Sequence, residues 1–235
     1  MIKLVTFLKR RDGLSRPEFE QRWLTVHAPM AAVFQGLRGY MLSFPVWPAH
    51  EEPSADGVAQ LWFDSEEATQ ESYSTDVGRS GSRDAASNLS RRQHLFASEQ
   101  WIVAPPSLAG FPFKLLVACK RLPPLDRSAF LGAWDGVARQ VARDVFPGLP
   151  SRVCFDRRGK VLNSSPGGQL ALIDADAVHD GMLEVWTDSE ASVIELASRV
   201  AAPPASLLAI GTGFEILPMK ENVIVMPPSP AYGIA

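Results

Sequence analysis

The chain has 235 residues, of which 46% are hydrophobic and 21% are charged, and its formal net charge is −3 at pH 7. This composition supplies enough apolar material for a packed core. The slightly acidic balance gives no reason to expect nucleic acid or an anionic membrane as a partner. The two cysteines, Cys119 and Cys154, form no CxxC pair, so they indicate neither a disulfide framework nor a thiolate metal site. We therefore expect a globular, cytoplasmic protein.

The first predicted elements are a strand and a helix. Residues 2–10 form an apolar run that ends in basic residues, and this run is too short for a signal sequence or a membrane span. It predicts a strand. A helix should begin after Ser15, because Ser15 and Glu18 have the spacing of a capping box. Apolar residues then recur at intervals of three and four, which places them on one helical face: Phe19, Trp23, Val26 and Met30.

Three further elements complete the first half of the chain. A strand should follow the turn at Gly36, and another alternates in polarity over residues 58–62. Asp64 or Ser65 is expected to cap a second helix, and a fourth strand passes through residues 101–103. The resulting order, β-α-β-β-α-β, is typical of ferredoxin-like folds, in which both helices cover one face of an antiparallel sheet.

The same order recurs in the second half of the chain as an internal repeat. Four blocks return in sequence: residues 3–10, 33–37, 56–66 and 101–106 match residues 114–121, 145–149, 180–190 and 223–228. Phe19 and Trp23 correspond to Phe130 and Trp134 at a constant offset, and Asp126 takes the N-cap position of the second copy. Four blocks in one order indicate a duplication.

The repeat predicts the fold class and the domain organisation. We expect an α+β protein of two fused ferredoxin-like units, residues 1–106 and 112–228, whose antiparallel sheets pack into an α/β barrel. A single unit would leave one apolar sheet face uncovered, and the second unit can cover it. The barrel could close within one chain, as an internal pseudo-dimer in a monomer, or form in a homodimer. The longer connection at 156–181 predicts an extra hairpin or a surface insertion.

The N-terminal region resembles a known family. Residues 7–19 read FLKRRDGLSRPEF, and Trp23, His27 and Pro29 follow in a WxxxHxP pattern. Together these residues resemble the N-terminal signature of the EthD family, which belongs to the dimeric α/β-barrel superfamily. The resemblance implies a small apolar pocket for a hydrophobic, often aromatic molecule. Related barrels include cofactor-independent oxygenases, polyketide cyclases, lactone isomerases, and dehydratases or decarboxylases of aromatic polyketides.

His27 is the first candidate catalytic residue. It lies four residues after Trp23, on the helical face that should point toward the sheet. Pro29 lacks an N–H and should bend the helix near His27, which makes room for a ligand. An imidazole titrates near neutral pH and suits general acid/base catalysis, although a buried histidine satisfied by a neighbouring carbonyl is the alternative. The position equivalent to His27 in the second half is Ala138, so that half is expected to support the first.

Two more residues are candidate partners of His27. Tyr40 should stand at the start of the second strand, where its phenol could reach a ligand or simply pack. His94 precedes the last strand of the first half and could line the same pocket. The other histidines, His50 and His179, lie in predicted loops and are expected to be solvated.

Substrate-binding candidates lie on the predicted strands. Gln60 and Trp62 share one strand face, as do Glu184 and Trp186 in the second half, because strand side chains alternate. A polar group beside an aromatic ring is typical of a ligand pocket, and the tryptophans could equally fill core space. Trp23 is the fifth candidate. If the second half had chemistry of its own, its polar candidates would be Asp135, Arg143 and Glu184.

The sequence contains no Gly-rich nucleotide fingerprint, P-loop, HExxH or GxSxG motif, and its four histidines are too scattered to predict a metal site. We therefore expect no cofactor and no metal. The leading hypothesis is a lyase that eliminates water, carbon dioxide or a small aldehyde from a hydrophobic, aromatic substrate. A cofactor-free monooxygenase, an isomerase and a non-catalytic binding protein are the alternatives.

Overall fold

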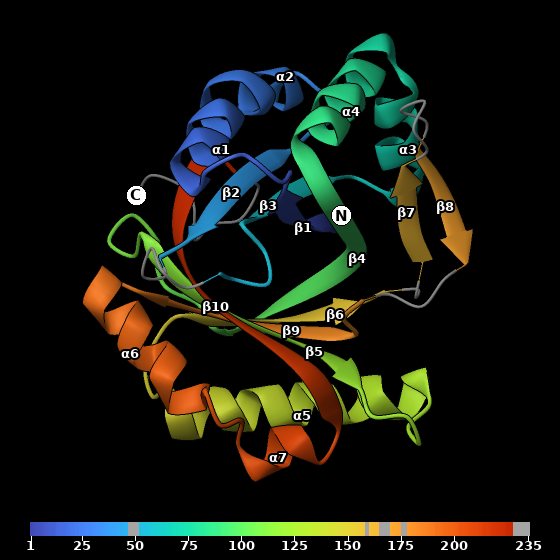
Figure 1. The fold of residues 1–235 in the computed structure, drawn as a ribbon. Coiled ribbons are helices and arrows are strands. Elements are labelled where there is room, and N and C mark those ends of the chain that lie inside the picture. Colours follow the sequence, from blue (N-terminus) through green and yellow to red (C-terminus); the bar gives the residue numbers. More distant parts are fainter. Residues whose placement is uncertain (47–51, 158–159, 165–169, 175–177, 228–235) are drawn as a thin grey trace.

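The computed structural model describes residues 1–46, 52–157, 160–164, 170–174 and 178–227 (Figure 1). The elements of the first half are, in order, β1 (Ile2–Arg10), α1 (Arg16–Arg22), the π-helix η1 (Trp23–His27), α2 (Ala28–Ala32), β2 (Gly39–Pro45), β3 (Gly57–Phe63), α3 (Glu66–Ser74), α4 (Asp76–Asn88) and β4 (Leu89–Val103). Within the described part of the chain, no helix is long and apolar enough to span a membrane.

The second half follows the same order. Its elements are β5 (Phe113–Arg121), α5 (Arg127–Val145), β6 (Ser151–Asp156), β9 (Gly181–Thr187), α6 (Glu190–Val200), α7 (Ala205–Leu208) and β10 (Gly211–Val225). Between β6 and β9 stands a two-stranded hairpin of β7 (Lys160–Ser164) and β8 (Leu170–Asp174). Apart from this hairpin, each half shows the predicted β-α-β-β-α-β order, and of the two alternatives for residues 156–181 the hairpin is the one present.

Eight strands close into one antiparallel barrel in the order β1-β3-β2-β10-β5-β9-β6-β4. Each half contributes four neighbouring strands, and the halves join at two seams, β2 with β10 and β4 with β6. Both seams form within a single chain. Figure 1 shows the helices outside the barrel, with α1 to α4 over the strands of the first half and α5 to α7 over those of the second half.

The predicted helix caps are present. Ser15 and Glu18 form the reciprocal capping box of α1, in which the Ser15 hydroxyl accepts from the Glu18 amide and the Glu18 carboxylate accepts from the Ser15 amide. Ser65 caps α3, and Asp126 caps α5. These caps fix where each helix leaves the sheet and therefore which helical face the sheet meets.

Two apolar layers separate the helices from the barrel wall. In the first half Phe19 and Trp23 pack against the outer face of the strands, and in the second half Phe130 and Trp134 do so. Trp134 lies so close to Gly181 that a Cβ there would come within 2.5 Å of the indole. The second helix layer therefore packs directly on β9 without space for a ligand at this point.

The prediction that His179 is solvated is wrong. Its side chain is only 2% exposed, with the ring 4.6 Å from that of Phe7 and Nε2 3.6 Å from a Glu215 oxygen. A residue expected to lie in a solvated loop is thus buried beside Phe7 of β1. The other histidine expected to be solvated, His50, lies outside the described residues. Asp135 and Arg143 are solvent-exposed positions on α5.

Candidate active site

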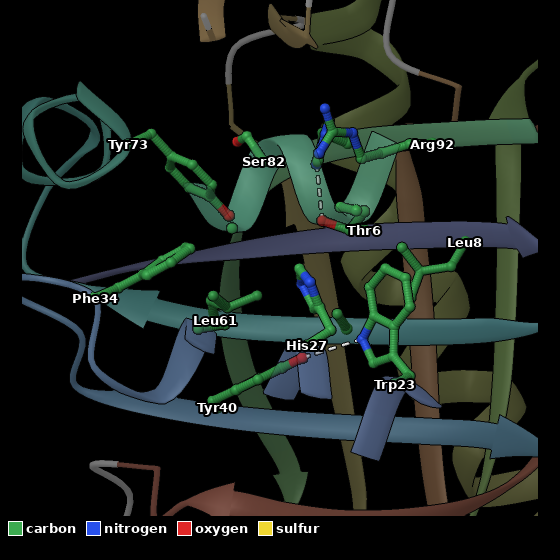
Figure 2. Close-up of a pocket in the computed structure, with 15 residues that line it drawn as sticks. Thr6, Leu8, Trp23, His27, Phe34, Tyr40, Leu61, Tyr73, Ser82 and Arg92 are labelled. Atoms are coloured by element: carbon green, nitrogen blue, oxygen red, sulfur yellow. Dashed lines mark hydrogen bonds between the residues drawn. The ribbon is translucent and has the colours of Figure 1, made fainter. Parts of the chain in front are cut away.

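A cavity of about 30 Å³ lies between the helices of the first half and the outer face of β1, β2, β3 and β4 (Figure 2). That volume holds one or two water molecules, so a ring-sized occupant must displace side chains at its wall. Aromatic residues form much of the wall, namely Trp23, Phe34, Tyr40 and Tyr73. On the α4 side the wall is made by the small residues Gly81, Ser82 and Ala85, which let the helix approach Phe34 closely.

His27 enters this cavity from a π-helical turn. The amide of Ala28 donates to the carbonyl of Trp23, five residues earlier, so the helix is widened at the position before Pro29. The bend predicted at Pro29 therefore takes the form of a π turn. π turns often occur at functional sites. Here the turn places His27, 8% exposed, beside Trp23 with their ring centroids 4.1 Å apart.

Asp84 of α4 holds one nitrogen of His27. Its Oδ2 lies 3.0 Å from His27 Nδ1, while its Oδ1 accepts from Arg22 at 2.5 Å. The hydrogen bond with His27, together with the charge of Arg22, holds the pKa of Asp84 below its ordinary value despite partial burial. Asp84 is thus a carboxylate at neutral pH. It favours the tautomer in which His27 Nδ1 carries the proton, leaving Nε2 as the basic atom.

His94 lies within β4, not before the last strand as predicted, because that strand begins at Leu89. It is a neutral imidazole on the opposite wall. Its Nδ1 lies 2.8 Å from the Thr6 hydroxyl, and its Nε2 is buried without a hydrogen-bond partner. Burial, reinforced by the charge of Arg92, places the pKa of His94 well below 6.5. If the Thr6 hydroxyl donates to Nδ1, the proton of His94 sits on Nε2, where it can be donated to a ligand.

Tyr40 lies on β2 at the floor of the same cavity. Its hydroxyl accepts a hydrogen bond from Trp23 Nε1 at 3.3 Å, and the residue is 1% exposed. Burial raises the pKa of Tyr40 above the ordinary 10.0 of a tyrosine, so the phenol keeps its proton across the neutral range. The structure thus brings together four of the predicted site residues, Trp23, His27, Tyr40 and His94. Their roles in catalysis stay predictions.

Several residues of the cavity were not anticipated from the sequence. Asp84, Arg92, Tyr73 and Ser82 come from segments with no motif and reach the pocket only through the packing of α3, α4 and β4. Burial raises the pKa of Tyr73 to about 12. One signal was available for Arg92, because it lies two residues before His94 and strand alternation puts both on one face.

The matching positions of the second half carry no such groups. In the first half Thr6 of β1 pairs with His94 of β4. The corresponding pair in the second half is Val117 of β5 with Ile216 of β10, so valine replaces Thr6 and isoleucine replaces His94. Tyr40 of β2 pairs with Leu61 of β3, and Ser151 of β6 pairs with Val185 of β9 at the same place in the second half. Ser151 is therefore the counterpart of Tyr40. Ala138, at the position of His27, is fully buried in the core of its half.

The other predicted binding residues point into the barrel, on the opposite face of the sheet from the cavity. Gln60, Trp62, Glu184 and Trp186 are each at most 2% exposed. Glu184 accepts from Lys3 and Lys114 at 2.9 Å, from Gln60 at 2.6 Å and from Arg152 at 2.8 Å. The structure therefore does not bring these residues to His27, and a ligand-binding role for them stays untested.

The interior network has an approximate twofold arrangement. Trp62 Nε1 donates to Glu99 at 3.0 Å and Trp186 Nε1 donates to Glu221 at 2.8 Å. Each tryptophan also lies under a lysine, Lys3 at 5.6 Å and Lys114 at 5.4 Å from the ring centroid. Arg152 breaks the symmetry, since its counterpart across the register is Met41.

One set of interior residues has the composition of a metal site. Glu99, Cys154 and Glu184 place one ligand atom each within 4.8 Å of one another. Lys3 and Arg152 already pair with both carboxylates, and burial raises the pKa of the Cys154 thiol to about 12. Neutralised carboxylates and a protonated thiol do not suit a divalent cation.

The fold and the cavity define an α/β-barrel protein with a small pocket in its first half, lined by aromatic residues and two histidines. Residues 11–89 match the model of the EthD domain. The match includes Trp23, His27, Tyr40 and Asp84. No curated protein matches the chain.

Three solved structures share the whole fold at low sequence identity. An anthrone oxidase-like protein is 10% identical with a TM-score of 0.61, over 100% of this chain and 96% of that one. A proposed monooxygenase of Fusobacterium nucleatum subsp. nucleatum ATCC 25586 is 8% identical with a TM-score of 0.54, over 99% and 98%. A proposed monooxygenase of Lactobacillus acidophilus NCFM is 11% identical with a TM-score of 0.51, over 96% of each chain. These likenesses establish the fold alone.

Proposed function

We propose that this chain is an acid/base enzyme that acts, without a cofactor, on a hydrophobic aromatic small molecule in the N-terminal cavity. The observation that carries the proposal is the pair of histidines on facing walls, one held by a carboxylate and one kept neutral by burial. Pairs of titratable groups whose environments differ in this way are typical of acid/base sites.

In the proposed reaction His27 takes a proton from the substrate. Nε2 of His27 accepts the proton from a C–H or O–H group, and Asp84 stabilises the imidazolium that results. The electron pair left on the substrate is delocalised as an enolate or phenolate, and the Nε2–H of His94 donates a hydrogen bond to the developing oxyanion. The low exposure of both histidines keeps water from competing for these hydrogen bonds.

A lyase is our first choice for the step that follows. The electron pair on the substrate forms a double bond as the leaving oxygen departs, and the proton held by His27 passes to that oxygen to release water. Loss of carbon dioxide or of a small aldehyde would use the same two histidines. An isomerase would return the proton to another carbon atom.

A cofactor-free monooxygenase is the second candidate, and the fold likeness to an anthrone oxidase-like protein favours it. Here dioxygen would react with the substrate anion, so that one CH2 group and O2 give a carbonyl group and water. Both candidates begin with the same proton abstraction by His27, and they differ in the mass of the product.

We also infer that residues 1–106 and 112–228 are two fused ferredoxin-like units and that the second unit supports the first. Each half contributes four neighbouring strands to the barrel, which supports the division into two units. Ala138 and Ile216 stand where the first half has His27 and His94, which supports a structural role for the second unit. Because both barrel seams lie within one chain, we propose a monomer with an internal pseudo-dimer. Sedimentation equilibrium would test this state against a homodimer.

The test of the proposed function is turnover. The purified protein is incubated with a panel of aromatic metabolites, without added cofactor, and products are followed by mass spectrometry beside His27→Ala and His27→Gln. We expect one compound to be consumed by the wild type and spared by both variants, with a mass change that names the reaction. Tight binding without any conversion would support a non-catalytic binding protein, and equal turnover by wild type and variants would remove His27 from the mechanism.

A further inference from the structure

Arg92 places a positive charge in the cavity, and it forms no salt bridge among the described residues. Its guanidinium lines the pocket, and its Nη2 is buried without a hydrogen-bond partner among the described residues. Asp84, the carboxylate that contacts His27 of the pocket, is engaged by Arg22 and His27. Burial lowers the pKa of Arg92, with Tyr73 opposing that shift. A partly buried charge with an unpartnered nitrogen is costly and rarely persists without a role.

The second half shows what the fold uses at this place when only packing matters. Phe214 lies two residues before Ile216, as Arg92 lies two residues before His94, and both apolar residues pack against the core of their half. The same barrel is therefore built with hydrophobic side chains at these strand positions. Arginine and histidine in the first half are not needed to form the strand.

Two further polar atoms of the cavity lack partners beside Arg92. Nε2 of His94 and the hydroxyl of Ser82 are both buried and without a hydrogen bond in the described structure. Figure 2 shows Arg92 and Ser82 on one side of the cavity and Tyr40 and Trp23 on the other. Arg92, Ser82 and His94, whose pKa the charge of Arg92 helps to lower, thus each bring a polar atom without a partner to a pocket whose wall is otherwise rich in aromatic rings.

We propose that this end of the cavity binds an anionic oxygen of the substrate, so that the enzyme acts on aromatic molecules that carry a carboxylate or an acidic phenol. The oxygen would accept from Arg92, His94 Nε2 and the Ser82 hydroxyl, while the ring packs among Trp23, Phe34 and Tyr73. This inference rests on the proposed function for the site and specifies its substrate class. The bound anion supplies the negative charge that Arg92 lacks.

The first experiment compares two probes of equal shape and different charge, benzoate and benzamide, by isothermal titration calorimetry. A charge-assisted hydrogen bond from Arg92 should make benzoate bind about tenfold to a hundredfold more tightly than benzamide. Arg92→Met should abolish this preference. Arg91→Met is the matched control, because Arg91 is the next residue on the opposite, exposed face and donates to the Ser54 carbonyl.

A phenol probe separates the two kinds of anion. The absorbance of 4-nitrophenol reports its ionisation directly, and we expect its pKa to fall when it binds the wild type and not when it binds Arg92→Met. Preference for benzoate together with an unshifted phenol would restrict the class to carboxylates, and both effects together would admit phenols as well.

Thermal melting shows whether Arg92 has a merely structural role. Free Arg92→Met should melt at or above the wild-type temperature, since a desolvated charge has been removed, and benzoate should raise the melting temperature of the wild type alone. A clear fall in the melting temperature of the free variant, equal binding of benzoate and benzamide, or no binding of either would overturn the inference. Binding is measured apart from turnover. An inactive protein that prefers benzoate would therefore contradict the proposed function while leaving the anion site intact.

Discussion

Replacing Glu184 with Gln would test how far the charged interior stabilises the barrel. Glu184 is fully buried and accepts hydrogen bonds from Lys3, Lys114, Arg152 and Gln60 at distances between 2.6 and 2.9 Å. Burial alone raises the pKa of Glu184, but Arg152, Lys114 and Lys3 and the hydrogen bond from Gln60 together place it well below 4.5. The carboxylate is therefore charged in the folded protein.

The glutamine variant keeps the shape of the side chain and removes its charge. Three buried cations would then share only Glu99 and Glu221. Breaking a buried ion pair on one side typically costs about 3–5 kcal/mol, so we expect Glu184→Gln to lower the free energy of unfolding by about that amount. Urea denaturation followed by far-UV circular dichroism measures the change.

Because the interior is approximately twofold symmetric, the lost charge can be restored at an equivalent position. Gln60 occupies in β3 the place of Glu184 in β9, and it already bonds Lys114 at 3.0 Å. The double variant Gln60→Glu with Glu184→Gln returns the negative charge at the symmetric position, so it should recover at least half of the lost stability. Arg152 limits the recovery, because Met41 stands at its counterpart. A double variant no more stable than the single one would refute the view that charge balance stabilises the interior.

Three other predictions concern the cavity residues Asp84 and Tyr40 and the pH dependence of stability. Asp84→Asn should lower kcat by about tenfold to a hundredfold with little change in KM, because the charge-assisted bond to His27 Nδ1 is lost. The control is Asp135→Asn, which removes an Asp–Arg contact on α5 and should leave kcat unchanged. Tyr40→Phe should destabilise the fold by about 1 kcal/mol, because Trp23 Nε1 loses its acceptor, and an unchanged urea midpoint would contradict this expectation. Acid should destabilise the wild type more than Glu184→Gln. Because folding depresses the pKa of Glu184, its contribution to the free energy of unfolding is present above pH 4.5 and is lost progressively as the pH falls below that value. Urea midpoints at pH 7 and pH 4 would show the difference.

The sequence could predict the elements and their order because those depend on local signals. The cap at Ser15, the helical face shared by Trp23 and His27, and the recurrence of blocks between the halves each arise from neighbouring residues or from direct repetition. The family likeness of the first half follows from the same local motif and is matched over residues 11–89.

The remaining features depend on contacts between distant segments. Asp84 meets His27 across 57 positions, and nothing in the sequence around Asp84 distinguishes it from an ordinary solvated helix residue. Alternation correctly placed Gln60 beside Trp62, but it could not tell which face of a closed barrel holds a ligand. His179 was assigned to solvent because loop composition does not show which way the chain turns.

Proton abstraction by His27 can be followed as hydrogen exchange into the substrate. A panel of aromatic acids and phenols with acidic C–H groups is incubated with the protein in D2O, and deuterium uptake is followed by NMR. We expect uptake at one carbon atom with the wild type, little or none with His27→Gln, and reduced uptake with Asp84→Asn. Equal uptake by the wild type and His27→Gln, or no uptake for a compound that binds the pocket, would contradict this expectation.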